Sequence, residues 1–161
     1  RRDVLLEARK ELPAEEQLQV LERLASADIE LADTTGKKGY REEAIEVLTQ
    51  IIDQGWGTFD TADTLAIQYE KQGEIEQARK TVDQMLETYG EDYRIYMRYA
   101  FLEIDTQELK ENAQRDYSQF AEYYEKAEEL YHEQVKDNNT DAQMQLLEDV
   151  YGQVKEGGWL E

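Results

Sequence analysis

The side chains that could do chemistry in this chain are few, and several lie near its C-terminal end. The run DNNTDAQMQLLE puts oxygen-bearing side chains at the first, third, fifth and twelfth places of a calcium-binding loop: Asp137, Asn139, Asp141 and Glu148. The sixth place of such a loop needs a sharp turn that glycine makes easily, and here it is Ala142. The same run can form a turn followed by a helix that Asp141 caps, and we favour this second interpretation.

Catalytic side chains are equally scarce. His132 is the only histidine, cysteine is absent, and Ser26 and Ser118 are the only serines. An enzyme needs a nucleophile, a base and a stabiliser of developing charge that converge on one point, and no spacing in the sequence brings such groups together. We therefore predict no catalytic residue, no metal site and no cofactor, and we expect His132 at a surface or between repeats.

The charge balance bears on the kinds of partner. The chain has 38 acidic residues against 18 basic ones, a net charge of -20. Nucleic acids and anionic membrane surfaces both attract lysine and arginine, so we predict no nucleic-acid partner and no direct membrane insertion. No apolar run approaches the roughly 20 residues that span a bilayer. Because the chain begins at Arg1 without methionine, we expect it to be a fragment of a longer protein.

Apolar spacing predicts helices along most of the chain. A single proline and the absence of β-branched alternation favour an all-α class. We expect a short helical piece over residues 2–11, then a helix from Pro13 to about Asp33. A turn over Gly36–Gly39 should lead into a second helix that ends near Gly55.

The stretch from Phe59 to Asp92 predicts two antiparallel helices joined at Gly73. Apolar residues recur at helical spacing on one face of each helix: Leu65, Ala66 and Tyr69 in the first, and Ala78, Val82 and Met85 in the second. The pattern repeats at intervals of 34 residues. The residues at equivalent positions are Leu31, Ala32, Gly39 and Ala44 before the stretch and Tyr99 and Ala100 after it.

A 34-residue period with Leu-Ala, Tyr, Gly and Ala at these offsets resembles the tetratricopeptide repeat (TPR) family. The resemblance implies an all-α fold of antiparallel helix-pair repeats, a right-handed superhelix or α-solenoid with cap helices. The expected division is a helical cap or extension over 1–24, three repeats over 25–134, and a capping helix with its tail over 135–161. The repeats are expected at 25–58, 59–92 and 93–134.

The third repeat is 42 residues long in this division, and we expect its extra residues to enlarge the turn between its helices, over Gln107–Gln114. The run Arg115–Tyr131 then resembles the family's second helix. Its expected packing residues are Tyr117, Phe120, Tyr124 and Ala127.

A last amphipathic helix is expected over Asp141–Glu156, because a repeat array needs a helix that covers its final apolar face. Asp141 is the expected N-cap and Gly157 the expected C-cap. Trp159 and Leu160 are expected to fold back onto this helix.

Four segments narrow the resemblance: DQGWGT at 53–58, YGEDYRIYMRYA at 89–100, RDYSQFAEYYEKAEELY at 115–131 and MQLLEDVYGQVKEGGWL at 144–160. They look like the TPR region attached to certain bacterial serine/threonine protein kinases, although no kinase motif is present. This resemblance implies a sensor or docking region of a larger bacterial signalling protein. Such a region would be soluble, either cytoplasmic or the exposed part of a membrane-tethered parent.

The family's pattern lines a concave groove with the first helix of each repeat, and it implies a protein- or peptide-binding scaffold. The expected groove residues are Ile29, Asp33, Asp60, Asp63, Ile67, Arg94, Met97, Arg98 and Phe101. They combine an acidic entrance, an apolar strip and two arginines, so basic groups of a peptide should be attracted by the field. The clamp that some members use for a chaperone's C-terminal carboxylate would lack most of its donors here, and we reject it.

Alternatives accompany this interpretation. Arg94 and Arg98 can instead pair with Asp60 and Asp63 of the neighbouring helix, and we favour that role for the arginines. Seven of the eleven tyrosines lie between Tyr93 and Tyr131, and we expect packing rather than a recognition surface. A structural or oligomerising module without a peptide ligand, such as a homodimer, is the alternative function.

Overall fold

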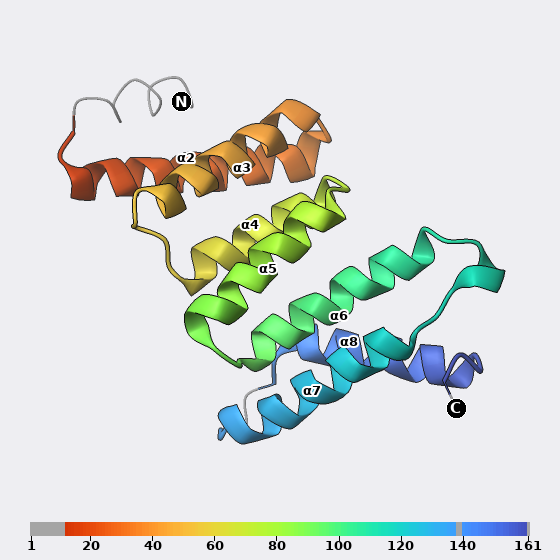
Figure 1. Cartoon of the computed structure of the whole chain (residues 1–161). Coiled ribbons are helices and arrows are strands. Elements are labelled where there is room, and N and C mark those ends of the chain that lie inside the picture. Colours follow the sequence, from red (N-terminus) through yellow and green to blue (C-terminus); the bar gives the residue numbers. More distant parts are fainter. Residues whose placement is uncertain (1–11, 138–139, 161) are drawn as a thin grey trace. The chain divides into compact units, whose positions relative to one another are not determined.

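The computed structural model of the chain describes residues 12–137 and 140–160. Within these ranges every regular element is a helix and there is no strand, so the predicted all-α class is confirmed (Figure 1). The chain divides into two compact units, the first ending at Thr81 and the second beginning at Val82. Each unit is described by itself. The helical piece expected over 2–11 lies outside the described residues.

The N-terminal unit is built from α2 (Ala14–Thr35), α3 (Lys38–Asp53), α4 (Phe59–Lys71) and the first part of α5 (Ile75–Tyr89). Pro13 is the N-cap of α2. Its φ of -56° lies in the range to which the pyrrolidine ring restricts proline. Gly36 ends the helix in the left-handed region at φ 70°, which a side chain would disfavour.

α2 agrees with the helix predicted from Pro13 to about Asp33, whereas the turn after it is shorter than predicted. α3 begins at Lys38, so the second half of the predicted Gly36–Gly39 turn is helical. The connection needs no more than Gly36 and Lys37, because the left-handed glycine reverses the chain by itself.

The core of the N-terminal unit forms where α3 packs between α2 and α4. Its buried members are Leu21, Leu24, Ala25, Val47, Leu48, Ile51 and Leu65, with Ile29, Trp56 and Tyr69 packed at its margin. Full burial of each large aliphatic side chain contributes roughly 1.5–3 kcal/mol. The predicted spacing of leucine, valine and isoleucine therefore identifies the packed faces.

The predicted helix pair around Gly73 is present as α4 and α5. Thr58 caps α4 by accepting from the backbone N–H of Thr61, whose hydroxyl in turn accepts from the backbone N–H of Thr58. Gly73 adopts φ 84°, and the next residue, Glu74, donates its backbone N–H to the carbonyl of Tyr69 at 2.9 Å. This bond and the glycine close the turn between the helices.

The C-terminal unit contains the rest of α5, α6 (Tyr93–Glu108), a 3₁₀ turn η1 (Asn112–Gln114), α7 (Ser118–Gln134) and α8 (Ala142–Glu156). α6 packs along α7, and α8 packs against both of them (Figure 1). The buried members of its core cluster are Met97, Ala100, Ile104, Tyr117, Phe120, Tyr124, Ala127, Met144, Leu147 and Val154. The predicted packing positions of α7 are thus confirmed.

The long connection after α6 begins later than predicted. Gln107 was expected in the enlarged turn but is a buried residue of α6. Its amide donates to Glu103 at 2.8 Å, and its carbonyl oxygen accepts from the backbone N–H of Asp116 at 2.9 Å. Arg115 donates to two backbone carbonyls at the end of α6 and just after it. A polar residue therefore ties the connection to the helix, which apolar spacing cannot reveal.

The C-terminal helix follows the prediction closely. The carboxylate of Asp141 accepts from the backbone N–H groups of Gln143 and Met144, as an N-cap does. Gly157 is the C-cap. Trp159 folds back and meets the ring of Tyr117 edge-on, with 5.2 Å between ring centroids.

Candidate functional site

The N-terminal unit holds five of the predicted groove residues. Asp33 and Asp60 are exposed, whereas Ile29, Asp63 and Ile67 are half-buried. Ile29 packs against the core of this unit, so only part of its side chain faces solvent. These five residues lie on α2 and α4.

Asp33 already has two cationic partners. Its carboxylate accepts from Arg41 at 2.7 Å and pairs with Lys71 at 3.3 Å. The hydrogen bond from Arg41, together with Lys71, holds the pKa of Asp33 below its ordinary value. Arg41 also donates to the buried Gln68, which orients the guanidinium.

The C-terminal unit holds the other four, and two of them are not groove residues. Met97 and Arg98 were expected in an open groove, but their exposed fractions are 2% and 3%. Met97 belongs to the core together with Met144 of α8. Arg98 donates to Gln143, also of α8, at 3.0 Å. The prediction of an exposed Met97 and Arg98 is wrong because the capping helix covers this face of α6.

Phe101 and Arg94 keep partial exposure. Phe101 is half-buried at the edge of the core, and the guanidinium of Arg98 lies 5.9 Å from its ring centroid. Arg94 is half-buried and forms an ion pair with Asp92, the N-cap of its own helix, at 2.8 Å. Burial alone would raise the pKa of Asp92, but the hydrogen bonds from Arg94 outweigh it and lower that pKa.

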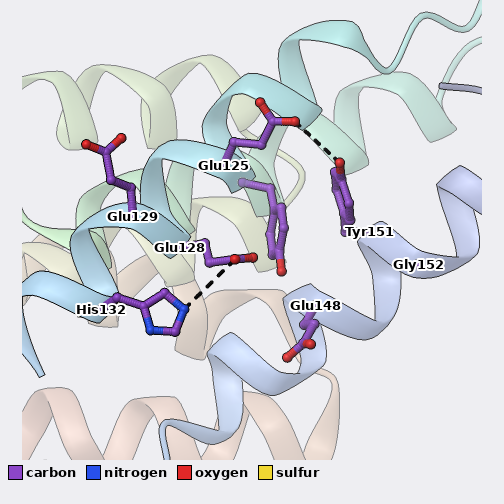
Figure 2. A pocket seen from close by; sticks show the side chains of 8 residues that line it. Glu125, Glu128, Glu129, His132, Glu148, Tyr151 and Gly152 are labelled. Atoms are coloured by element: carbon purple, nitrogen blue, oxygen red, sulfur yellow. Dashed lines mark hydrogen bonds and ion pairs between the residues drawn. The ribbon is translucent and has the colours of Figure 1, made fainter. Parts of the chain in front are cut away.

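A cleft of about 530 Å³ lies between α7 and α8, in a place that the sequence did not indicate (Figure 2). We call it the acidic cleft. Its lining comprises Tyr124, Glu125, Glu128, Glu129, His132, Glu148, Tyr151 and Gly152. A smaller pocket of about 200 Å³ shares Tyr124, Glu128, His132 and Glu148 with it.

Helical spacing explains how the lining residues come together. On α7, Glu125, Glu128 and His132 lie three and four residues apart, and on α8 Glu148 and Tyr151 lie three residues apart. Figure 2 shows Glu128 and Glu148 reaching into the space between the helices, while Glu129 points away from α8.

Two tyrosines fix the base of the acidic cleft. The rings of Tyr124 and Tyr151 are stacked, with 4.2 Å between centroids and 20° between planes. Burial, a hydrogen bond to Glu128 and the charge of Glu148 raise the pKa of Tyr124. Burial and the charge of Glu125, to which its hydroxyl donates at 3.3 Å, raise the pKa of Tyr151. Both phenols thus stay protonated beside the carboxylates.

The charged lining of the acidic cleft is one-sided. Four glutamates contribute to it, and neither lysine nor arginine does. His132 is exposed and lies 3.9 Å from Glu128. Carboxylates beside two aromatic rings are suited to an ammonium or guanidinium group, because both kinds of group attract a cation. The spacing of Glu125, Glu128 and His132 in the sequence places them on one face of a helix. It does not show that α7 packs against α8.

The residues at the spacing of a calcium loop have other roles, as the favoured interpretation of a turn and a capped helix implies. Asp141 is the N-cap of α8 and accepts from the hydroxyl of Tyr93 at 2.8 Å. Glu148 lines the acidic cleft. Asn139 lies outside the described residues. In the part of the chain that the structure describes, no group of three or more His, Asp or Glu side chains is arranged to hold a metal ion.

No helix among the described residues combines the length and apolarity needed to cross a membrane.

Comparison with known proteins gives one result. The family model described as tetratricopeptide repeat matches residues 59–102. Searches of curated proteins and of solved structures returned no match. The matched segment contains α4, α5 and the first ten residues of α6, and it begins at the predicted start of the second repeat. This part of the chain is therefore similar to a tetratricopeptide repeat, a helical unit that generally mediates contacts between proteins.

Proposed function

We propose that the chain is a protein-binding module and that its acidic cleft takes a lysine or arginine side chain of the partner. The proposal rests on the negative charge of the cleft lining. Every fully charged side chain in its lining is a glutamate. The similarity of residues 59–102 to a TPR supports a protein as the partner.

The dimensions of the acidic cleft agree with such a ligand. A volume of about 530 Å³ leaves room for a long side chain and part of its backbone. The aliphatic stem of lysine or arginine can pack on Tyr151 while its head group meets Glu128 and Glu148. Each exposed ion pair contributes at most about 1 kcal/mol, so the affinity depends on several such contacts acting together.

The predicted groove residues that keep exposure are further proposed contacts. They are Ile29, Asp33, Asp60, Asp63 and Ile67 in the N-terminal unit and Arg94 and Phe101 in the C-terminal unit. Half-buried isoleucine and phenylalanine provide apolar area, and Asp60 and Asp63 favour a basic peptide.

A direct test uses a short fluorescent peptide with two arginines and neutral neighbours. We expect saturable binding in fluorescence anisotropy, weakened about tenfold by the double change Glu128→Gln and Glu148→Gln. The matched control is Glu133→Gln with Glu156→Gln, two exposed residues of α7 and α8 outside the cleft lining. Equal weakening by both pairs would show a diffuse field effect and contradict the proposal.

We further propose that this module is the sensor or docking region of a larger bacterial signalling protein, attached to a serine/threonine kinase. The four sequence segments at 53–58, 89–100, 115–131 and 144–160 support this proposal. The complete coding sequence tests it: a kinase domain in the same product is the expected result, and an unrelated enzyme domain would contradict it.

Self-association is a second candidate function, favoured by one observation. Leu146 on α8 is 55% exposed, and an apolar residue on a capping helix can mediate pairing between copies. Light scattering distinguishes the candidates. A stable dimer that Leu146→Glu converts to a monomer supports this second function, and a monomer at high concentration contradicts it.

A further inference from the structure

A second pocket, in the N-terminal unit, has the opposite charge. It encloses about 430 Å³ where the C-terminal ends of α2 and α4 meet the start of α3, and we call it the basic pocket. Its lining comprises Ala32, Gly36, Lys37, Lys38, Arg41, Lys71 and Gln72. Four of these residues are cations and none is an acid. In a chain with 38 acidic residues against 18 basic ones, such a lining is unexpected.

Part of this cationic lining is held in place by a neighbouring carboxylate. Asp33, which is not a lining residue, accepts from Arg41 at 2.7 Å and from Lys71 at 3.3 Å. The side chain of Arg41 is only 13% exposed and also donates to Gln68, itself buried. One carboxylate thus orients two cations and leaves a positive balance. Pre-orientation lowers the entropy that a ligand would otherwise have to overcome.

The other two cations, Lys38 and Lys37, are more exposed to solvent than Arg41. Lys38 is 74% exposed and its ammonium lies 3.7 Å from Glu42. Lys37 is exposed and precedes the first turn of α3, whose N-terminal dipole also favours an anion. Lys37 and Lys71 stand 34 residues apart, so the repeat places a lysine at the same position of two successive units.

Cations at the ends of α2 and α4 also complement the negative C-terminal dipoles of those helices. That role accounts for Lys71, in the last turn of α4. Lys37 lies between the C-terminal end of α2, which favours a cation, and the start of α3, which does not, and Lys38 is the first residue of α3, where the dipole is unfavourable to a cation. A ligand with negative charge would remove this unfavourable arrangement.

The net charge of -20 does not prevent an anion from reaching the basic pocket. At physiological ionic strength the screening length is about 8 Å, so distant carboxylates contribute little at this position. The four lining cations are much closer to a group in the pocket than those carboxylates are, and the partly buried Arg41 is screened less than an exposed charge.

We propose that the basic pocket binds a phosphate group, as free inorganic phosphate or on a phosphorylated side chain. A phosphate group offers three strong acceptor oxygens and about 1.5 to 2 negative charges at neutral pH, which suits a lining of one guanidinium and three ammonium groups. A single carboxylate would leave more of this charge uncompensated.

The test is a titration of the ¹⁵N-labelled chain with sodium phosphate, followed by NMR at constant ionic strength set with sodium chloride. We expect saturable shifts of the backbone amides of Gly36, Lys37 and Gly39 at millimolar phosphate. The double change Lys37→Gln and Lys38→Gln should weaken the affinity about tenfold, because both cations are lost while neither contacts the core. Lys80→Gln with Lys110→Gln removes the same charge elsewhere and should leave the affinity unchanged.

A second arm identifies the source of the phosphate. A short peptide of glycines and alanines with one phosphoserine is compared with inorganic phosphate and with the unphosphorylated peptide. Tighter binding of the phosphopeptide supports a phosphorylated segment as the ligand, and equal affinity supports free phosphate. Absence of saturable shifts with both, or equal loss in the control pair of variants, would overturn the proposal. The result does not depend on whether the acidic cleft binds a basic peptide.

Discussion

Asp33 shows how much of the N-terminal unit's charge arrangement depends on one side chain. Its carboxylate joins Arg41 of α3 to Lys71 of α4 although it is itself on α2. Three helices are thus linked through a single exposed residue. Exposed ion pairs contribute little individually, but this one also determines the direction of the Arg41 guanidinium.

The pKa of Asp33 predicts how its contribution varies with pH. Because the hydrogen bond from Arg41 lowers this pKa below 3.8, the stabilising contribution is complete above that value and disappears as pH falls through the folded-state pKa. We expect Asp33→Asn to lower Tm at pH 7, and the difference from the native chain to narrow as pH falls below 3.8 and to close once pH is below the folded-state pKa of Asp33. Thermal scans by circular dichroism measure it. A difference that stays constant with pH would contradict the ion-pair role.

Tyr99 allows a prediction about the stability of the C-terminal unit. Its hydroxyl donates to Asp83 at 2.6 Å, its ring stacks on Tyr123 at 5.0 Å, and it is 5% exposed. Tyr99→Phe removes the hydrogen bond but keeps the ring, so we expect a loss of about 1–2 kcal/mol in the free energy of unfolding. Urea denaturation measures the loss. Tyr89→Phe is the control, since Tyr89 is 45% exposed, and it should change stability much less.

At the residue scale the sequence predicted packing better than exposure. The apolar residues of α7, such as Phe120 and Ala127, are buried as their spacing indicated. Met97 and Arg98 were assigned to a groove from repeat positions alone, and these positions do not say which other element covers them. That information depends on how α8 docks, which side-chain periodicity along one helix does not contain.

At the scale of elements, α8 has several roles although it buries only three side chains. Met144, Leu147 and Val154 are its buried side chains, and its N-cap Asp141 also bonds to Tyr93 of α6. The same helix covers Met97, orients Arg98 and forms one wall of the acidic cleft. Capping and the candidate binding site therefore share one element.

Removal of the N-cap tests how firmly α8 is held. Asp141→Ala deletes the acceptor for the backbone N–H groups of Gln143 and Met144 and for the hydroxyl of Tyr93. We expect a loss of about 1–2 kcal/mol in the free energy of unfolding. The exposed Asp149 lies on the same helix, so Asp149→Ala removes an equal charge as control. Similar urea midpoints for the two variants would contradict the importance of the cap.

The sequence also predicted elements better than their ends and contacts. Leucine spacing and Gly73 located α4 and α5, and Asp141 located the start of α8. The role of Gln107 was missed. Its side-chain amide donates to Glu103 and accepts from the backbone N–H of Asp116, which keeps it within α6, and a hydrophobic pattern carries no information on such hydrogen bonds. The two pockets were missed because each requires residues from different helices, although Lys37 and Lys71 shared a repeat position.

At the scale of the whole molecule, the charge of -20 is the dominant feature. Like charges repel one another more in the folded chain than in the expanded unfolded chain, so self-repulsion destabilises the native state. The acidic cleft adds to this repulsion by placing Glu125, Glu128 and Glu148 around one space.

Salt should therefore stabilise the protein. The screening length falls from about 30 Å to about 8 Å between about 0.01 M and 0.15 M monovalent salt. We expect Tm to rise over this range, because long-range repulsion is screened more than the short ion pairs at Asp33 and Asp92. Differential scanning calorimetry in sodium chloride measures it. A fall in Tm would show that the ion pairs outweigh the repulsion.

The placement of the two tryptophans gives each compact unit its own optical label. Trp56 packs at the margin of the N-terminal core, and Trp159 rests against Tyr117 in the C-terminal unit. They are the only tryptophans in the chain, so replacing either one by phenylalanine leaves fluorescence from a single, known unit. Without any attached dye, the melting of each unit and its response to phosphate or to a basic peptide can be recorded separately.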